Sequence, residues 1–211
     1  MARYIGASCR LCRAEGQKLF LKGARCYSGK CSVLRRSYAP GQHGQGGRKK
    51  VSEFGHQLRA KQKARRYYGV LEKQFNHYYD LAEHEKEGKA GESMLALLES
   101  RFDNVIYRLG WANSRAHARQ LLLHGHFNVN NGKVNIPSYL LKVGDFVSLS
   151  KKGRSSDVLK EIIASNSSRG LPKWLEFTGG EHFEAKVLAK AERVDIDLEV
   201  DETLIIELYS R

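Results

Sequence analysis

The strongest constraint in the sequence is the place of its positive charge. Residues 1–70 carry 17 Lys and Arg but only two Asp and Glu, which gives this segment a net charge of +15. Residues 71–211 carry 19 basic and 21 acidic residues, so the rest of the chain has a net charge of −2. Because like charges repel each other as a chain compacts, we expect a basic arm on a near-neutral body, and a polyanionic partner for that arm.

Composition and hydropathy exclude several classes of protein. Hydrophobic residues make up 41% of the chain, which excludes wholesale disorder. The apolar runs are only a few residues long, as in residues 94–98, so no membrane span is expected. The chain begins Met-Ala-Arg-Tyr-Ile-Gly, which lacks the apolar stretch of a signal peptide. We therefore expect a soluble cytoplasmic protein, with an organelle as the alternative location.

All four cysteines fall within the first 31 residues, at Cys9, Cys12, Cys26 and Cys31. Two short pairs of thiolates can complete the tetrahedral shell of a zinc ion, and a reducing compartment disfavours disulfides. Apolar residues between Cys9 and Cys31 are too few for an independent core, so this segment needs a cross-link to fold stably. The spacing predicts one zinc ion held by four cysteines, with an iron–sulfur cluster or unliganded thiols as alternatives.

A glycine-rich segment, residues 38–47, follows the cysteines. Pro40 and the repeated glycines disfavour regular structure and let backbone amides approach a ligand closely. The composition is typical of a flexible linker, but basic residues on both sides also suit a phosphate backbone. We interpret His43 as a hydrogen-bond donor rather than a metal ligand.

A long helix is expected next, capped by Ser52, running to about Tyr68 and ending at Gly69. Its apolar face is thin, and five basic residues surround it: Arg59, Lys61, Lys63, Arg65 and Arg66. Since no acidic residue lies between Glu53 and Glu72, we expect phosphates to neutralise this helix.

Helical periodicity continues beyond this point. Apolar residues recur every three or four positions over 71–84 and over 95–109, with a break near Ser100 in the second stretch. We expect the tyrosines of the first stretch to lie in the core, although tyrosines can also stack on bases.

A short helix over 115–124 is expected to start at Asn113 or Ser114. Its leucines point to the core, whereas Arg115 and Arg119 stand one turn apart on a common face. We expect that face to be exposed and to contact phosphates.

Short strands follow this helix. Alternation over 127–129, then the turn Asn131-Gly132, predicts a β-hairpin whose second strand holds Val134 and Ile136. The later expected elements are a strand at 146–149, a helix at 158–164, a short helix beginning at Pro172 and a strand near 187–189.

Several motifs in the second half resemble the S-four RNA-binding domain. They are Ser114–Leu122, His124-Gly125-His126, Val129-Asn130, Ile136-Pro137-Ser138 and Gly144-Asp145. The wider chain resembles the S-four family of small-subunit ribosomal proteins, bacterial or organellar, through residues 38–44, 57–63, 101–110 and 209–211. The four cysteines resemble the zinc-bearing branch of that family. Phe102 stands where we expect leucine, and it keeps the apolar character.

The resemblance implies an α+β fold. It has a zinc-stapled basic N-terminal extension, a helical domain completed by the C-terminal segment, and an inserted S-four-type RNA-binding domain of short helices and a small antiparallel sheet. On this chain the expected boundaries are 1–45, 46–96 completed by 190–211, and 97–189. The C-terminal segment is acidic, so we expect it to pack on basic helices or on a basic protein partner.

The resemblance also implies a structural ribosomal protein without catalysis. It would bind small-subunit ribosomal RNA, nucleate assembly of the subunit body and contribute to translational accuracy, with ribosomal proteins S five and S twelve as neighbours and no homo-oligomer in the ribosome. The residues expected at the RNA are Arg3, Arg35, Arg36, His43, Arg48, Lys49, Lys50, Arg59, Lys61, Lys63, Arg65, Arg66, Ser114, Arg115, His117, Arg119, His124 and His126.

Two other functions are compatible with parts of the sequence. An RNA-modifying enzyme could carry the same domain, and Arg101-Phe102-Asp103 distantly resembles the Arg-x-Asp of pseudouridine synthases, but we interpret Asp103 as a helix-surface acid. A free zinc-dependent RNA chaperone or translational repressor would show the same basic surface without residence on the ribosome.

Overall fold

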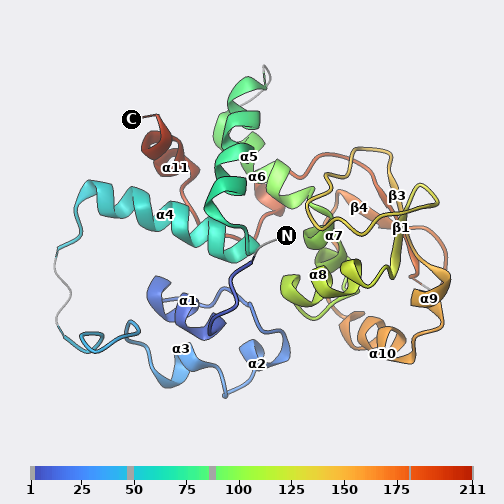
Figure 1. The fold of residues 1–211 in the computed structure, drawn as a ribbon, viewed down its shortest axis with the longest axis horizontal. Helices are drawn as coiled ribbons and strands as arrows, with labels where there is room; N and C mark the ends of the chain where they lie inside the picture. Colours follow the sequence, from blue (N-terminus) through green and yellow to red (C-terminus); the bar gives the residue numbers. More distant parts are fainter. Residues whose placement is uncertain (1–2, 47–49, 86–88, 181, 211) are drawn as a thin grey trace. The chain divides into compact units, whose positions relative to one another are not determined.

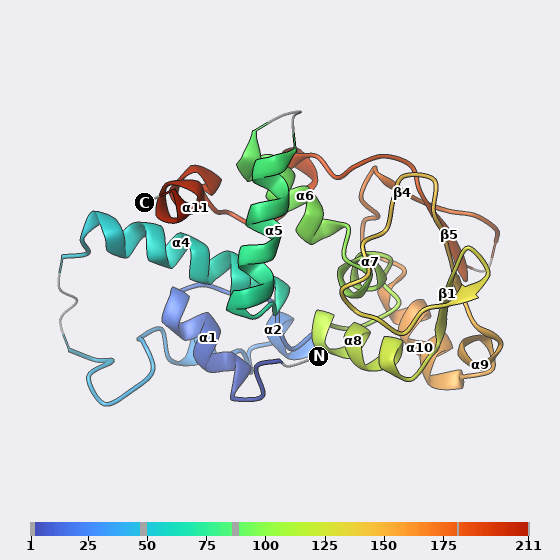
Figure 2. The ribbon, with the colours of Figure 1, turned by 45° about the horizontal axis from the view of Figure 1, so that its top comes forward.

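The computed structural model describes residues 3–46, 50–85, 89–180 and 182–210. The contacts divide the chain into two compact units (Figure 1). One unit contains the residues up to Met94 together with those from Leu198 onward, and the other contains Leu95–Asp197. Figure 2 gives a second view of the same elements.

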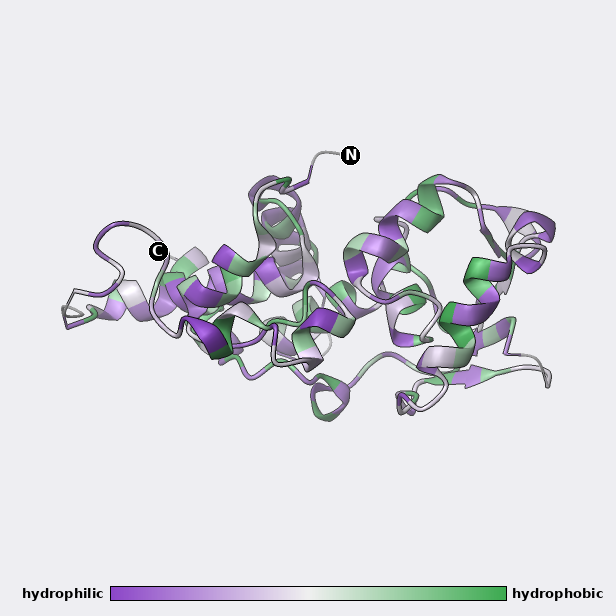
Figure 3. Cartoon of the chain, turned by 90° about the horizontal axis from the view of Figure 1, so that it is seen from below, coloured by the Kyte–Doolittle hydropathy of each residue, from purple (hydrophilic) through white to green (hydrophobic). Residues whose placement is uncertain are grey.

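The first unit is built from helices. They are α1 (Ser8–Glu15), α2 (Ala24–Tyr27), α3 (Ser32–Arg35), α4 (Glu53–Tyr68), α5 (Glu72–His84), the first half of α6 (Ala90–Glu99) and α11 (Glu202–Tyr209). Hydrophilic and hydrophobic residues are interspersed along the helices (Figure 3). In keeping with this pattern, none of the described helices has the length and hydropathy needed to cross a membrane.

Local signals set the bounds of α4, as expected. The Oγ of Ser52 accepts a hydrogen bond from the backbone N–H of Gly55 at 3.3 Å, and Gly69 ends the helix with φ of 67°. That left-handed conformation favours glycine. The apolar stripe expected on α5 is also buried; its members are Phe75, Tyr78, Tyr79 and Ala82.

The C-terminal helix α11 packs on α4 (Figures 1 and 2). Tyr209 stacks on Tyr79 and Phe75, with ring centroids 4.7 and 6.4 Å apart, and Ile205 is fully buried. The side-chain amide of Gln57 in α4 donates to Glu207 at 3.0 Å. The expectation that the C-terminal segment packs back on the helical part of the chain is confirmed.

Most basic residues of α4 form ion pairs with acidic residues of the same protein. Four of them pair with two carboxylates outside the helix: Lys61 and Arg65 with Glu72, and Arg59 and Arg66 with Glu15 of α1. The ammonium group of Lys63 donates to the backbone carbonyl of Glu199. The expectation that only phosphates neutralise this helix is therefore wrong, because folding brings acids from distant positions in the sequence.

Glu72 is held in its charged form by this arrangement. Burial raises the pKa of Glu72, but hydrogen bonds from Lys61 and Tyr209 and the charge of Arg65 outweigh burial and hold the pKa below its ordinary value. The contacts from Lys61 and Tyr209 measure 2.6 and 3.1 Å. One carboxylate therefore ties together α4, α5 and α11.

The second unit combines helices with one antiparallel sheet of strand order β2-β1-β3-β5-β4. Its core includes Trp111, which stacks on Phe127 with centroids 5.7 Å apart. This arrangement confirms the expected α+β class with a small antiparallel sheet. The further elements are α7 (Phe102–Arg108), α8 (Arg115–Leu123), β1 (Phe127–Val129), β2 (Gly132–Lys133), β3 (Phe146–Leu149), α9 (Lys151–Arg154), α10 (Asp157–Asn166), β4 (Leu175–Phe177), β5 (Glu184–Val187) and the 3-10 turn Arg193–Asp195.

Three local expectations in this unit are wrong in detail. The strand β2 ends at Lys133, so Val134 and Ile136 lie outside it. Val129 pairs with Gly132, so the two-residue turn is Asn130-Asn131 rather than Asn131-Gly132. Both asparagines have positive φ, 47° and 64°, which asparagine tolerates better than most residues with a side chain. No helix begins at Pro172; the chain enters β4, whose backbone groups are satisfied by pairing with β5.

A buried ionic cluster joins α7 to α8. The Asp103 carboxylate accepts hydrogen bonds from Arg101 at 2.7 and 3.0 Å and from Arg119 at 2.7 Å. These three side chains are at most 7% exposed. Asp103 is therefore not a helix-surface acid, because two guanidinium groups cover it.

The expectation that Arg115 and Arg119 share an exposed face is also wrong. Arg115 donates from Nε to the Asn104 amide oxygen at 2.7 Å, and its guanidinium lies over the Tyr107 ring at 4.6 Å. Helical spacing does place the two arginines on one face, but α7 covers that face. Their main contacts hold the two helices together.

The ionic cluster yields a stability prediction. Asp103→Asn removes the charge between two buried guanidinium groups and should lower the free energy of unfolding by about 3–5 kcal/mol, measured by urea denaturation. Asp157→Asn removes a carboxylate whose side chain is 90% exposed and should cost less than about 1 kcal/mol. Equal midpoints for the parent and Asp103→Asn would contradict this role of the cluster.

Glu72 yields a pH prediction. Because its folded-state pKa is depressed, its contribution is fully present above the unfolded pKa of about 4.3 and is lost as pH falls through the lower folded value. Glu72→Gln should therefore be less stable than the parent at pH 7, and the difference should shrink below about pH 4. Glu83→Gln, on an exposed position of the same helix, is the control and should show no such pH dependence.

Candidate nucleic-acid interface and cysteine cluster

The four cysteines gather in the segment formed by α1, α2 and α3. Cys9 and Cys12 lie on α1, Cys26 lies on α2, and Cys31 caps α3. All except Cys9 are buried, and all four are free of disulfides. The backbone N–H of Lys22 donates to the Cys26 sulfur at 3.3 Å.

The thiols influence one another electrostatically. Burial raises the pKa of Cys12 and of Cys26, and the neighbouring thiols raise it further. Within the described residues, however, no three or more His, Cys, Asp or Glu side chains form a group that could hold a metal ion. The structure thus brings the four sulfurs into one segment without assembling a ligand shell.

The glycine-rich segment is folded into turns where it is described. Arg13 of α1 donates to the backbone carbonyls of Tyr38 and Ala39 at 3.0 and 3.2 Å, and its guanidinium lies over the Tyr38 ring. A Cβ atom on Gly44 would lie 1.9 Å from the Ala39 carbonyl oxygen, so only glycine fits there. The segment up to Gly46 is therefore anchored to α1 rather than an open linker.

The residues expected at RNA fall into three groups in the structure. The exposed ones are Arg3, Arg35, Arg36, His43, Lys50, Arg59 and His124. Those held in internal contacts or partly buried are Lys61, Lys63, Arg65, Arg66, Ser114, Arg115, His117, Arg119 and His126. Arg48 and Lys49 lie outside the described residues.

The histidines around α8 differ in their surroundings. The ring of exposed His124 lies 6.3 Å from the ring of His126. Burial lowers the pKa of His117, and burial together with the nearby Lys152 lowers the pKa of His126. These two histidines therefore favour the neutral form at pH 7, in which a ring nitrogen can accept a hydrogen bond.

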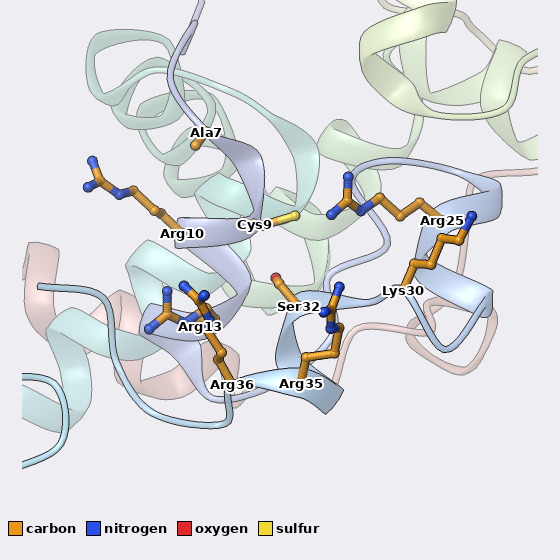
Figure 4. Close-up of a pocket in the computed structure, with 9 residues that line it drawn as sticks. All are labelled: Ala7, Cys9, Arg10, Arg13, Arg25, Lys30, Ser32, Arg35 and Arg36. Carbon is orange, nitrogen blue, oxygen red and sulfur yellow. The ribbon is translucent and has the colours of Figure 1, made fainter.

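Sequence reasoning missed one group of basic residues. Arg10, Arg13, Arg25 and Lys30 line a pocket together with Arg35 and Arg36 (Figure 4). Spacing along the chain does not show that three short helices place these side chains around one space. The only local signal is Arg10 and Arg13, which are three residues apart on α1.

Comparisons with known proteins cover the full chain. Residues 3–99 match the family model "Ribosomal protein S4/S9 N-terminal domain", and residues 100–147 match the model "S4 domain". Small ribosomal subunit protein uS4 of Clostridioides difficile (strain 630) is 59% identical over 211 residues, which is all of both chains. The proteins of the same name from Ruminiclostridium cellulolyticum and Acetivibrio thermocellus are 57% and 56% identical, again over the full length of each chain. Because two models match residues 3–147 and full-length relatives are more than half identical, the chain belongs to the family of small ribosomal subunit protein uS4.

Proposed function

We propose that this chain is a structural component of the small ribosomal subunit that binds ribosomal RNA and catalyses no reaction. The observation that carries the proposal is the pairing of an S4 domain with a +15 segment that still exposes basic residues after its internal ion pairs are formed. The alternative of an RNA-modifying enzyme loses its support, because Asp103 is buried between two arginines.

Within the subunit, we propose a role in the early assembly of the body and in translational accuracy. Neighbouring ribosomal proteins are the second class of partner, with S five and S twelve as the candidates. The C-terminal segment supports a protein contact, since acidic residues such as Glu192 and Glu199 lie exposed on it. An acidic surface of this kind suits a basic protein better than a phosphate backbone.

The RNA proposal is tested by the salt dependence of binding. Replacing Arg3 and Lys50 together by Ala should lower the slope of log K against log salt by about 2, since each lost phosphate contact contributes about 1. The measurement is filter binding of the full chain to small-subunit ribosomal RNA. The matched control is Lys73→Ala with Lys89→Ala, which removes the same charge from exposed positions outside the basic segment.

Two results would contradict the RNA proposal. One is equal affinity of the parent chain for small-subunit ribosomal RNA and for an unrelated RNA of the same length. The other is an unchanged slope in the Arg3 and Lys50 double variant while the control variant loses affinity.

We also propose that Cys9, Cys12, Cys26 and Cys31 hold one zinc ion. The support is the chemistry of the donors: four free thiols share a small segment in which few apolar side chains are buried, Leu19 being one. Bound zinc would supply the cross-links that this segment lacks, and its binding energy would be folding energy, of order 10 kcal/mol.

Metal analysis and chelation test the zinc proposal. Protein purified without chelators should contain about one zinc per chain, and chelation should make the first ~40 residues sensitive to protease while the body keeps its melting transition. In Cys12→Ser the same chelator should have no further effect. Visible absorption by the purified protein would instead indicate an iron–sulfur cluster, and a metal-free, protease-resistant N-terminus would rule out a metal here.

A further inference from the structure

A pocket of about 270 Å³ lies where α1, α2 and α3 meet (Figure 4). Arg25 extends into it from α2, Ser32 and Arg35 extend from α3, and Cys9 of α1 forms part of its wall. A water molecule takes up about 30 Å³ in the liquid, so the pocket has room for an anion of several heavy atoms.

The lining of this pocket carries six positive charges and no negative one. They belong to Arg10, Arg13, Arg25, Lys30, Arg35 and Arg36. Glu15 is the only acidic residue before Glu53, and it is engaged by Arg59 and Arg66 of α4. Among the described residues, the six basic side chains form no ion pair with a carboxylate.

We infer that this pocket is a binding site for a phosphate group of the RNA backbone. The inference rests on the proposed RNA binding and assigns part of it to one site. Guanidinium groups match phosphate oxygens with two parallel hydrogen bonds, and the Ser32 hydroxyl can donate a further one. An anion between α2 and α3 also relieves the repulsion among the cations that surround it.

The pocket fits an RNA chain better than a free anion. Five of its six cations are exposed, so they form an open rim that a polymer can pass over. Arg13 differs from the others, because hydrogen bonds to the carbonyls of Tyr38 and Ala39 fix its position. That anchor holds the glycine-rich segment beside the pocket, where its backbone can lie along the same RNA strand.

The test separates the effect of side-chain charge from that of hydrogen-bond geometry at Arg25 of α2 and Arg35 of α3, two exposed arginines on different sides of the pocket. The full chain is titrated with a small-subunit ribosomal RNA fragment as Arg25→Ala/Arg35→Ala, as Arg25→Lys/Arg35→Lys and as the charge-matched control Lys73→Ala/Lys89→Ala. The alanine variant should lower the slope of log K against log salt by about 1 for one lost phosphate. The lysine variant should lose most of the same affinity, because lysine keeps the charge but not the two-bond geometry. The control should bind like the parent.

Two further measurements separate the possible failures. Unchanged thermal melting and metal content show that a variant has lost the site rather than the fold. Failure of the parent chain to bind the RNA would overturn the proposed function itself. Parent-like binding by the alanine variant or full binding by the lysine variant would overturn the phosphate site while leaving RNA binding intact.

Discussion

Carboxylates shared between two basic side chains are the interaction on which this structure depends. Glu15 joins α1 to α4, Glu72 joins α4 to α5, and Asp103 joins α7 to α8. In each case the acid lies on a different element from at least one of its basic partners. The contact that neutralises the charges therefore also packs two elements together. A chain with 17 basic and two acidic residues in its first 70 positions has few other ways to compact without a partner.

The cations that do not pair with these carboxylates form the surface that we propose for RNA. In α4 most basic side chains pair with carboxylates of the protein, whereas the arginines around α2 and α3 stay exposed. The same segment carries the four cysteines and little buried apolar surface. The proposed zinc site and the proposed phosphate site are therefore built by the same short helices.

Local signals in the sequence predicted much of the fold. Ser52 and Gly69 mark the ends of α4 through hydrogen bonding and backbone conformation that act within a few residues. Arg119 shows the limit of local signals. Its spacing from Arg115 identifies a shared helix face, but the carboxylate that pairs with it belongs to Asp103, 16 residues earlier in the chain. The expected helix at Pro172 is absent for the same reason, since pairing with β5 determines the strand conformation of the residues that follow. The pocket cations could not be grouped without the packing of three helices.

A cross-linking map of the full chain on small-subunit ribosomal RNA is the most direct test of this account. The account predicts cross-links concentrated in the first 70 residues, at exposed positions such as Arg35 and Lys50, with a second group near His124. It also predicts none at the buried pair Arg115 and Arg119. Cross-links that avoid the basic segment and fall on the acidic residues after Glu192 would contradict it.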